Sequence, residues 1–493
     1  MPLPEQASAI YIAVNTHFDF FICLVFTMSI FLFKTFAKRI SSQYTLFNYV
    51  VFFNLICNYF ISEATYFDDC SGTLWITYIA KFTLIVGWGL YIVYLYIIKN
   101  DMLSDDGERL FCIDTALAGS LLFISAKDYL DIYIALEVVA FATYILIASD
   151  KNRYSAEAAL KYFLYSVYGS FMIALSFIYT FTYSGQTFFN LVGIMGFKTL
   201  NLDISAILLL SAFFAKLGVG IFYGWVAPVY QAISNYAFLF ISTVSKIIIL
   251  FPFVLMWDFI GLQGGNMFYY YIFTSLIFAN FISARNLLTE LNFRRIAAYS
   301  SIINFGIAIL GLFIGQFSFL EFTYFVIVYL IGTFATYSWH TLVNCHDDTG
   351  KEVTNINKFK FVNPVGNEIL SLSLIINSGL PPVTLFLYKI IIIGAITYSA
   401  GNGLDFSSII MGLIIVLSNI PLYYSYITII YKISFADFDK TPGIVADDRL
   451  KVHFSYIFFT IITFLVIITF YSISENFIIS FTNRQINYVL DGY

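Results

Sequence analysis

Charged residues are scarce in this chain. Only 11% of its 493 residues are Asp, Glu, Lys or Arg, whereas a soluble globular protein carries about 25%. Hydrophobic residues make up 60% of the chain, and its mean hydropathy is +0.83. The long apolar runs are continuous rather than alternating, which excludes a membrane-spanning β-barrel. The composition therefore predicts an all-α fold, a polytopic transmembrane helical bundle.

Cysteines are also few, and the N-terminus lacks basic residues. The five cysteines include no pair with the C-x-x-C spacing of many iron–sulfur and zinc sites. No metal site is therefore expected in the chain. Glycine-rich nucleotide fingerprints are also absent. Residues 1–8 contain no basic stretch, so neither a signal peptide nor a transit peptide is predicted.

Aromatic residues, in contrast, are abundant. The chain contains 56 Phe and 38 Tyr but only 9 Pro. Coding rich in A and T favours this composition, as it favours lysine over arginine. The bias suggests that an organelle genome encodes the chain.

Fourteen segments are long and apolar enough to cross a membrane, since a spanning helix needs about 20 residues. The twelfth segment is too long for one span and contains Gly379-Leu380-Pro381-Pro382. The fourteen cover roughly residues 14–34, 44–64, 73–98, 109–126, 128–149, 160–183, 203–224, 236–257, 267–286, 296–316, 318–342, 364–399, 407–431 and 453–480.

The basic residues support this segmentation. Most of the 25 lysines and arginines fall in connections that follow odd-numbered segments. Basic loops stay on the cytoplasmic or matrix side of a membrane. We therefore expect the basic loops to face the matrix or cytoplasm and both termini to lie on the opposite side.

A weak internal repeat divides the chain. Segments four to eight and nine to thirteen are two runs of five helices, so the second copy has to be inverted. In each run the fourth helix holds a lysine near a glycine or proline interruption, which indicates a transport path, although such residues are common in membrane helices generally. The expected divisions are 1–108 (three N-terminal helices), 109–257 and 258–431 (the two repeats), and 432–493 (a C-terminal loop and the last helix).

Five charged residues lie near the middle of apolar segments: Glu137, Lys81, Lys216, Lys246 and Lys389. Each costs about 2.5–3.5 kcal/mol at mid-membrane on insertion scales. Such residues normally face the bundle interior, pair with one another or line an ion path. The pattern predicts movement of protons or cations through the membrane.

Glu137 and Lys216 are the natural pair in this set. A glutamate alone in an apolar segment stays protonated, because burial disfavours its charge. A lysine nearby lets it ionise, and separating the two favours loss of the lysine proton. This behaviour would make the pair a switch. The alternative is a static buried ion pair that holds two helices together.

Lys246 and Lys389 are candidates for reversible protonation. Lys246 has no acidic neighbour in sequence, and it lies about 15 Å of helix from either end of its segment, which is too far for its amine to reach the membrane surface. Lys389 follows the Pro381-Pro382 break, where freed backbone groups need water or neighbours. Lys161 lies near a segment end and could reach the basic face. His340 is a possible relay, although a satisfied core histidine is as good a reading.

The stretches around these residues are similar to a known family. Together they resemble the antiporter-like membrane subunits of respiratory NADH:quinone oxidoreductase (complex I). A lysine at 389 points to chain 2 rather than chain 4 of that family, in its long fourteen-helix form. The stretches are FFAKLGVGIFYGWVAPVYQ at 213–231, TVSKIII at 243–249, NFRRIAAYSSIINFGIAILGL at 292–312, GLPPVTLFLYKI at 379–390, and, for chain 2, ALEVVAFATYILIA at 135–148 and SAEAALKYFLYSVYGSFMIALSFIYTF at 155–181.

The resemblance implies a proton path through Glu137, Lys216, Lys246 and Lys389, with Lys161 as a further member. Glu137 would stabilise protonated Lys216, and separation of the two would push the proton toward Lys246. Lys389 would exchange with the opposite side of the membrane or influence a neighbouring subunit.

The chain departs from the family pattern at several positions, two of which are histidines in the family. Tyr223 and Asn304 stand at these two positions. Both are possible relay residues because they could order water, but they are poor proton carriers at neutral pH.

The resemblance also implies the setting of the chain. It would be a non-redox subunit of a proton-translocating NADH:ubiquinone reductase in the mitochondrial inner membrane. Other membrane-arm subunits, including another antiporter-like one, and lipids are the expected partners. Flavin, iron–sulfur clusters and ubiquinone are expected in partner subunits and no cofactor in this chain. The alternatives are a subunit of a multisubunit cation/proton antiporter without redox coupling, or a passive scaffold, against which the costly buried lysines argue.

Overall fold

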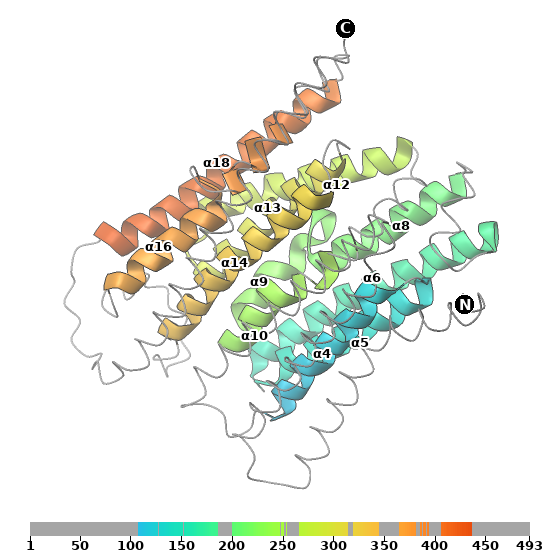
Figure 1. The fold of residues 1–493 in the computed structure, drawn as a ribbon, viewed down its shortest axis with the longest axis horizontal. Helices are drawn as coiled ribbons and strands as arrows, with labels where there is room; N and C mark the ends of the chain where they lie inside the picture. Colours follow the sequence, from blue (N-terminus) through green and yellow to red (C-terminus); the bar gives the residue numbers. More distant parts are fainter. Residues whose placement is uncertain are drawn as a thin grey trace, which may run out of the picture. The chain divides into compact units, whose positions relative to one another are not determined.

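The computed structural model of the chain is helical throughout the residues that it describes (Figure 1). The first three predicted segments, the last one and Lys81 lie outside these residues. The described residues are 107–126, 128–150, 152–185, 200–246, 248–250, 253, 266–313, 319–344, 364–380, 385–386, 388–390, 392–393 and 406–435.

The chain forms two compact units. The first comprises Met1–Thr323 with Leu413–Ser418, and the second comprises Tyr324–Gly412 with Asn419–Tyr493. These units differ from the divisions that the sequence repeat predicts, because they follow packing rather than helix order. The repeat boundaries therefore stay a prediction.

The helices of the first unit overlap the fourth to tenth predicted segments, except one short helix, Val226–Ala232, which lies between the seventh and the eighth. They are α4 (Gly107–Ser125), α5 (Tyr129–Ala148), α6 (Arg153–Ser184), α8 (Leu200–Leu217), η1 (Gly220–Trp225), α9 (Val226–Ala232), α10 (Asn235–Leu239), the π-helix η2 (Phe240–Val244), α12 (Asn266–Thr289) and α13 (Phe293–Phe313).

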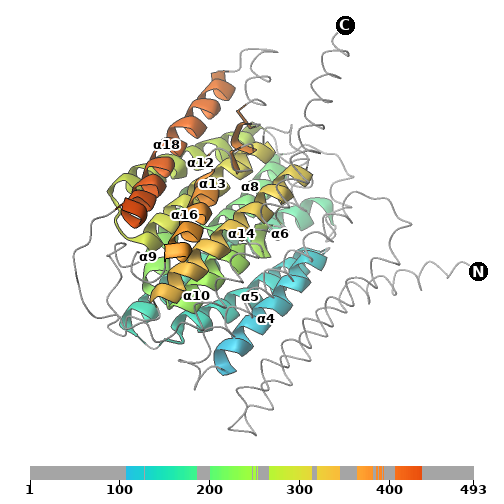
Figure 2. The ribbon, with the colours of Figure 1, turned by 60° about the vertical axis from the view of Figure 1, so that its left-hand side comes forward.

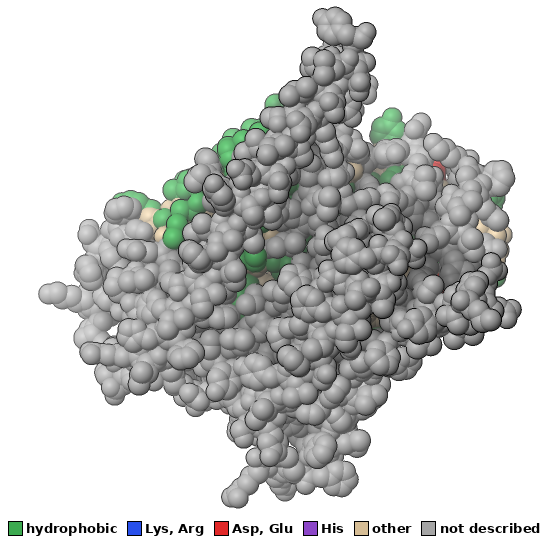
Figure 3. All heavy atoms as spheres, viewed as in Figure 1, with side chains coloured by type: hydrophobic (Ala, Val, Ile, Leu, Met, Phe, Trp, Pro, Cys, Tyr) green, Lys and Arg blue, Asp and Glu red, His purple; other side chains and the backbone are tan. Residues whose placement is uncertain are grey.

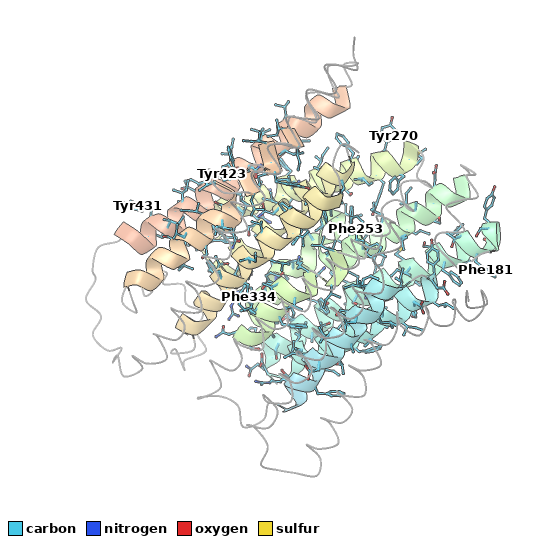
Figure 4. All side chains as sticks on the ribbon, viewed as in Figure 1. Phe181, Phe253, Tyr270, Phe334, Tyr423 and Tyr431 are labelled. Carbon is cyan, nitrogen blue, oxygen red and sulfur yellow. The ribbon has the colours of Figure 1, made fainter. Side chains whose placement is uncertain are left out.

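Packing within the first unit follows chain order. Helix α4 lies against α5, α5 against α6, and α6 against α8, while α12 packs on α13 (Figures 1 and 2). Aromatic rings fill the interior: Phe253 is fully buried and meets Phe213 edge-on at 5.4 Å between ring centroids (Figure 4). Close packing of such rings, rather than removal of apolar area from water, favours association of helices in a membrane.

Helix α8 stops inside its apolar segment. Gly218 (φ 68°) and Gly220 (φ 63°) have left-handed backbone conformations that favour glycine. A Cβ on Gly218 would also lie 2.2 Å from Val226 Cγ2, a distance that no side chain tolerates. The chain therefore continues as the short helices η1 and α9, so the seventh segment is an interrupted helix with the break two residues after Lys216.

The second unit contains most of α14 (Phe319–Asn344), α16 (Pro364–Ser378) and most of α18 (Phe406–Phe435). Helix α16 ends before Gly379, whose φ is 69°. Asn377 donates a hydrogen bond from Nδ2 to Thr336 Oγ1 at 2.8 Å, which joins α16 to α14. Helix α18 contains Pro421 in its interior.

In the described part of the chain, six helical stretches are long and apolar enough to cross a membrane: Tyr129–Ala148, Arg153–Ser184, Asp203–Ala232, Tyr270–Thr289, Phe293–Leu312 and Gly412–Lys432. Their outward faces carry large apolar side chains, such as Leu164 (64% exposed) on α6 and Tyr431 (63% exposed) on α18. Where described side chains reach the visible face in Figure 3, they are mainly hydrophobic. Such faces suit contact with lipid rather than water.

Candidate functional site

Lys216 lies at the end of α8, buried against α6. Its Nζ donates hydrogen bonds to Ser166 Oγ at 2.5 Å and to Ser170 Oγ at 3.3 Å. Its aliphatic stem crosses Gly169, where an added Cβ would be 3.2 Å from Lys216 Cε. Ser166, Gly169 and Ser170 lie one turn apart on one face of α6. This face of small residues forms a slot for the lysine, so we call these three residues the α6 slot.

Glu137 does not form the predicted ion pair with Lys216. It lies half-buried on α5, and among the described residues no salt bridge joins its carboxylate to that amine. The two charges still interact electrostatically. Tyr144, two turns further along α5, has a buried hydroxyl, and its ring packs edge-on against Tyr162 of α6 at 5.5 Å between ring centroids.

Lys246 follows the π-helix η2 and is only 3% exposed. Its Nζ donates a hydrogen bond to the backbone oxygen of Leu217 at 2.7 Å and lies 5.1 Å from the centroid of the Phe305 ring. The Leu217 carbonyl is available because α8 ends at that residue. A helix break thus supplies the acceptor that holds this lysine inside the first unit.

Lys389 repeats this arrangement within the second unit. Its Nζ donates to the backbone oxygen of Ser378 at 3.0 Å and to Asn419 Oδ1 at 2.8 Å, and it lies 5.4 Å from the centroid of the Tyr423 ring. Ser378 directly precedes Gly379, as Leu217 precedes Gly218. In both units a buried lysine therefore binds the last carbonyl before a left-handed glycine.

Lys161 stands apart from the other lysines. Its Nζ forms an ion pair with Glu157 at 2.6 Å, one turn earlier on α6, and the two side chains are 43% and 59% exposed. An exposed ion pair of this kind contributes little to stability, because water screens both charges. The structure does not bring Lys161 into contact with Lys216 or Glu137.

The three relay candidates lie in different surroundings. Tyr223 is half-buried in η1, and Asn304 is fully buried on α13, next in sequence to the Phe305 ring that faces Lys246. His340 lies on α14, and its side chain is outside what the structure describes. Of these residues, Asn304 is the one nearest in sequence to a lysine contact.

Sequence reasoning missed the α6 slot, Tyr144 and Asn419. The signal for the slot was present in Ser166-Val-Tyr-Gly169-Ser170, because small residues at spacings of three and four mark close helix contacts in membranes. Neither Tyr144 nor Asn419 carried such a signal, because no sequence pattern distinguishes either residue from the other asparagines or from the 38 tyrosines of the chain.

No metal centre emerges from the part of the chain that the structure describes. Within those residues, no group of three or more His, Cys, Asp or Glu side chains could hold an ion.

The model of one protein family matches residues 126–417, more than half of the chain. Its description is the transmembrane region of NADH:quinone oxidoreductase and the Mrp antiporter. The chain belongs to this family. It shares 25% identity over 412 residues with NADH-quinone oxidoreductase subunit N of Campylobacter jejuni, covering 77% of this chain and 79% of that protein. Subunit N of Ruthia magnifica is 27% identical over 362 residues, covering 70% and 72%.

Chains of two solved respiratory membrane complexes have a similar fold. A chain of the membrane-bound sulfane sulfur reductase, an archaeal respiratory membrane complex, superposes with a TM-score of 0.75 at 16% identity, covering 94% of each chain. A chain of respiratory complex I from Thermus thermophilus with bound aureothin superposes with a TM-score of 0.67 at 17% identity, covering 86% of this chain and 91% of that one.

Proposed function

We propose that this chain is a proton-translocating membrane-arm subunit of an NADH:ubiquinone oxidoreductase. It would correspond to chain 2 in its long form of fourteen spans, and to subunit N of the bacterial relatives. The observation that carries the proposal is a set of three buried amines held by neutral oxygens. Lys216, Lys246 and Lys389 donate to hydroxyl, amide or backbone oxygens, and none is in an ion pair with a described carboxylate.

Neutral acceptors suit a proton carrier better than a carboxylate does. A carboxylate at contact distance would fix a lysine in its charged form, whereas an amine that faces neutral oxygens can keep a hydrogen bond in either protonation state. The positions are also costly in a membrane, so a purely structural role would be served better by apolar residues.

The contacts of the first unit support a direction of transfer. Glu137 would stabilise the charge on Lys216, and a change in that interaction would favour release of the lysine proton. Lys246 binds the carbonyl of Leu217, the residue next to Lys216. The proton would therefore have its next acceptor close to the end of the same helix.

Lys389 would be the corresponding proton carrier of the second unit. It would exchange protons with the opposite side of the membrane or act on a neighbouring subunit. Electron transfer would take place in partner subunits that hold flavin, iron–sulfur clusters and ubiquinone. The chain would lie in the mitochondrial inner membrane, with its basic loops in the matrix and both termini on the intermembrane side.

A second candidate is a subunit of a cation/proton antiporter without redox coupling. It is favoured by the matching family, whose description joins the two kinds of complex. Transport by the two would differ in driving force. Dependence of proton movement on sodium rather than on NADH would support the antiporter.

Purification from membranes under mild detergent tests the proposal first. We expect the chain to co-migrate with flavin, iron–sulfur clusters and NADH oxidation. The complex is then placed in liposomes, and Lys216→Gln should abolish proton uptake coupled to NADH oxidation. Isolation without NADH oxidation, or full coupled uptake by the variant, would overturn the proposal.

A further inference from the structure

Asn419 is the side-chain acceptor for the Lys389 amine. The distance from Lys389 Nζ to Asn419 Oδ1 is 2.8 Å, and the second acceptor, at 3.0 Å, is the backbone oxygen of Ser378. All three residues belong to the second unit, where both Lys389 and Asn419 are buried. The lysine therefore relies on these oxygens for its hydrogen bonds.

One face of α18 makes this contact. Tyr423, labelled in Figure 4, follows Asn419 by four residues, so the two lie on the same side of the helix. The centroid of the Tyr423 ring is 5.4 Å from Lys389 Nζ. A different face of α18 carries the exposed apolar side chains of Leu417 and Ile420. The buried face is thus the one that presents an amide and a ring to the lysine.

Asn419 also marks the difference between two lysine sites that are otherwise alike. Lys246 and Lys389 each donate to the last carbonyl before a left-handed glycine, and each amine lies close to an aromatic ring. Among the described residues, Lys246 forms its hydrogen bond to that carbonyl alone, whereas Lys389 has the amide of Asn419 as well. The second unit therefore contains one more polar group at its lysine.

A side-chain amide can serve both protonation states of an amine. Its oxygen accepts from an ammonium, and its NH₂ group can donate to the lone pair of a neutral amine. The last torsion of an asparagine is broad and roughly two-fold, so half a turn exchanges the two ends at little cost. A carboxylate can only accept and favours the charged amine, and a backbone carbonyl in a helix cannot turn.

We propose that the amide of Asn419 turns as Lys389 gains and loses a proton, so that the amine keeps a hydrogen bond to it in both forms. The inference rests on the proposed function. When the proton leaves, one N–H bond of the ammonium breaks and one O–H bond forms on a water molecule, which becomes hydronium. The reverse step restores the ammonium. Asn419 itself neither gains nor loses a proton.

The variant Asn419→Asp separates this role from a purely structural one. The new side chain has nearly the same size and still accepts from Lys389, but it cannot donate when ionised. The variant complex is placed in liposomes, and proton uptake and NADH oxidation are measured separately. We expect protons moved per NADH to fall at least about tenfold, because a buried carboxylate holds an ammonium far more strongly than an amide does. Normal uptake would show that Asn419 supplies only an acceptor and would overturn the proposal.

The matched control is Asn286→Asp, the same change at a half-buried position of α12 in the first unit. It adds the same charge away from Lys389, so uptake should stay normal. An equal loss of uptake in both variants would mean that the added charge acts without Lys389, and this result would also overturn the proposal.

Infrared difference spectroscopy provides a reading that does not depend on the carboxylate variant. Turning the amide changes the hydrogen bond of its carbonyl group. The spectrum of the working complex should therefore contain a side-chain amide band that Asn419→Leu removes and that Lys389→Met removes as well. A band missing from the unaltered complex, or kept in Lys389→Met, would overturn the role of Asn419.

The same preparations keep this inference separate from the proposed function. Loss of coupled uptake in Lys389→Met, together with normal uptake in Asn419→Asp, would overturn the role of Asn419 and leave the proposed function intact. Normal uptake in Lys389→Met would overturn both.

Discussion

The amine of Lys246 donates a hydrogen bond to the backbone oxygen of Leu217, the residue that follows Lys216. A lysine on one helix is thus fixed to the point where another helix stops. The carbonyl is available because α8 ends there, and α8 ends because Gly218 adopts a left-handed conformation. The break in the helix therefore supplies the acceptor that holds the buried lysine in place.

Replacing Lys246 should stop transport without unfolding the chain. In Lys246→Gln the side chain keeps a neutral N–H donor and most of its length, while the group that carries the proton is lost. We expect proton uptake to fall by about 100-fold, measured in liposomes against NADH oxidation. Lys432→Gln, an exposed lysine in the last turn of α18, is the control. Equal uptake in both variants would contradict a transport role for Lys246.

Gly379 should be required for the position of Lys389. A Cβ on Gly379 would lie 3.1 Å from Lys389 Nζ and 3.3 Å from its Cε. In Gly379→Ala, the added methyl group pushes the amine away from the Ser378 oxygen, and the left-handed backbone adds about 1–2 kcal/mol of strain. We expect a lower thermal midpoint together with reduced proton uptake.

Gly185 supplies the matched control for that change. It has nearly the same φ, 67°, at the end of α6, but an added Cβ would have no atom within 4 Å. Gly185→Ala should lower the thermal midpoint by the backbone strain alone and leave uptake normal. If both variants lose the same amount of uptake, displacement of Lys389 is not the cause.

The positions of the buried lysines could be predicted from sequence, but their partners could not. A charge in the middle of an apolar segment is visible in the sequence itself, and the described helices other than α9 overlap the predicted apolar segments. The acceptors Leu217 and Ser378 are backbone atoms, which every residue has. Their use depends on where a helix ends, and a left-handed glycine decides that. Ser166 and Asn419 come from other helices, and only packing brings them to Lys216 and Lys389.

The contact between Asn377 and Thr336 should stabilise the second unit. The hydrogen bond from Nδ2 to Oγ1 is 2.8 Å long and fully buried, and Gly332 leaves room for the amide. We expect Thr336→Val to destabilise the unit by about 1–3 kcal/mol, because it leaves a buried amide proton without its partner. The midpoint of thermal unfolding in detergent measures the effect. Thr274→Val, at an exposed position of α12, should shift it far less.

Arg294 should hold the interrupted helix in the first unit. It donates hydrogen bonds to the backbone oxygens of Gln231 at 3.4 Å and Ile233 at 2.5 Å, and to Asn235 Oδ1, and it lies 5.3 Å from the Phe238 ring centroid. These carbonyls belong to the end of α9, where the helix leaves them without intrahelical partners. In Arg294→Lys, one compact ammonium replaces a planar group with several fixed donors, so most of these bonds are lost while the charge stays. We expect a lower thermal midpoint and easier proteolysis between α9 and α10. Arg285→Lys, at an exposed position of α12, should change neither property. Equal stability of the two variants would show that the charge of Arg294, and not its planar shape, holds this turn.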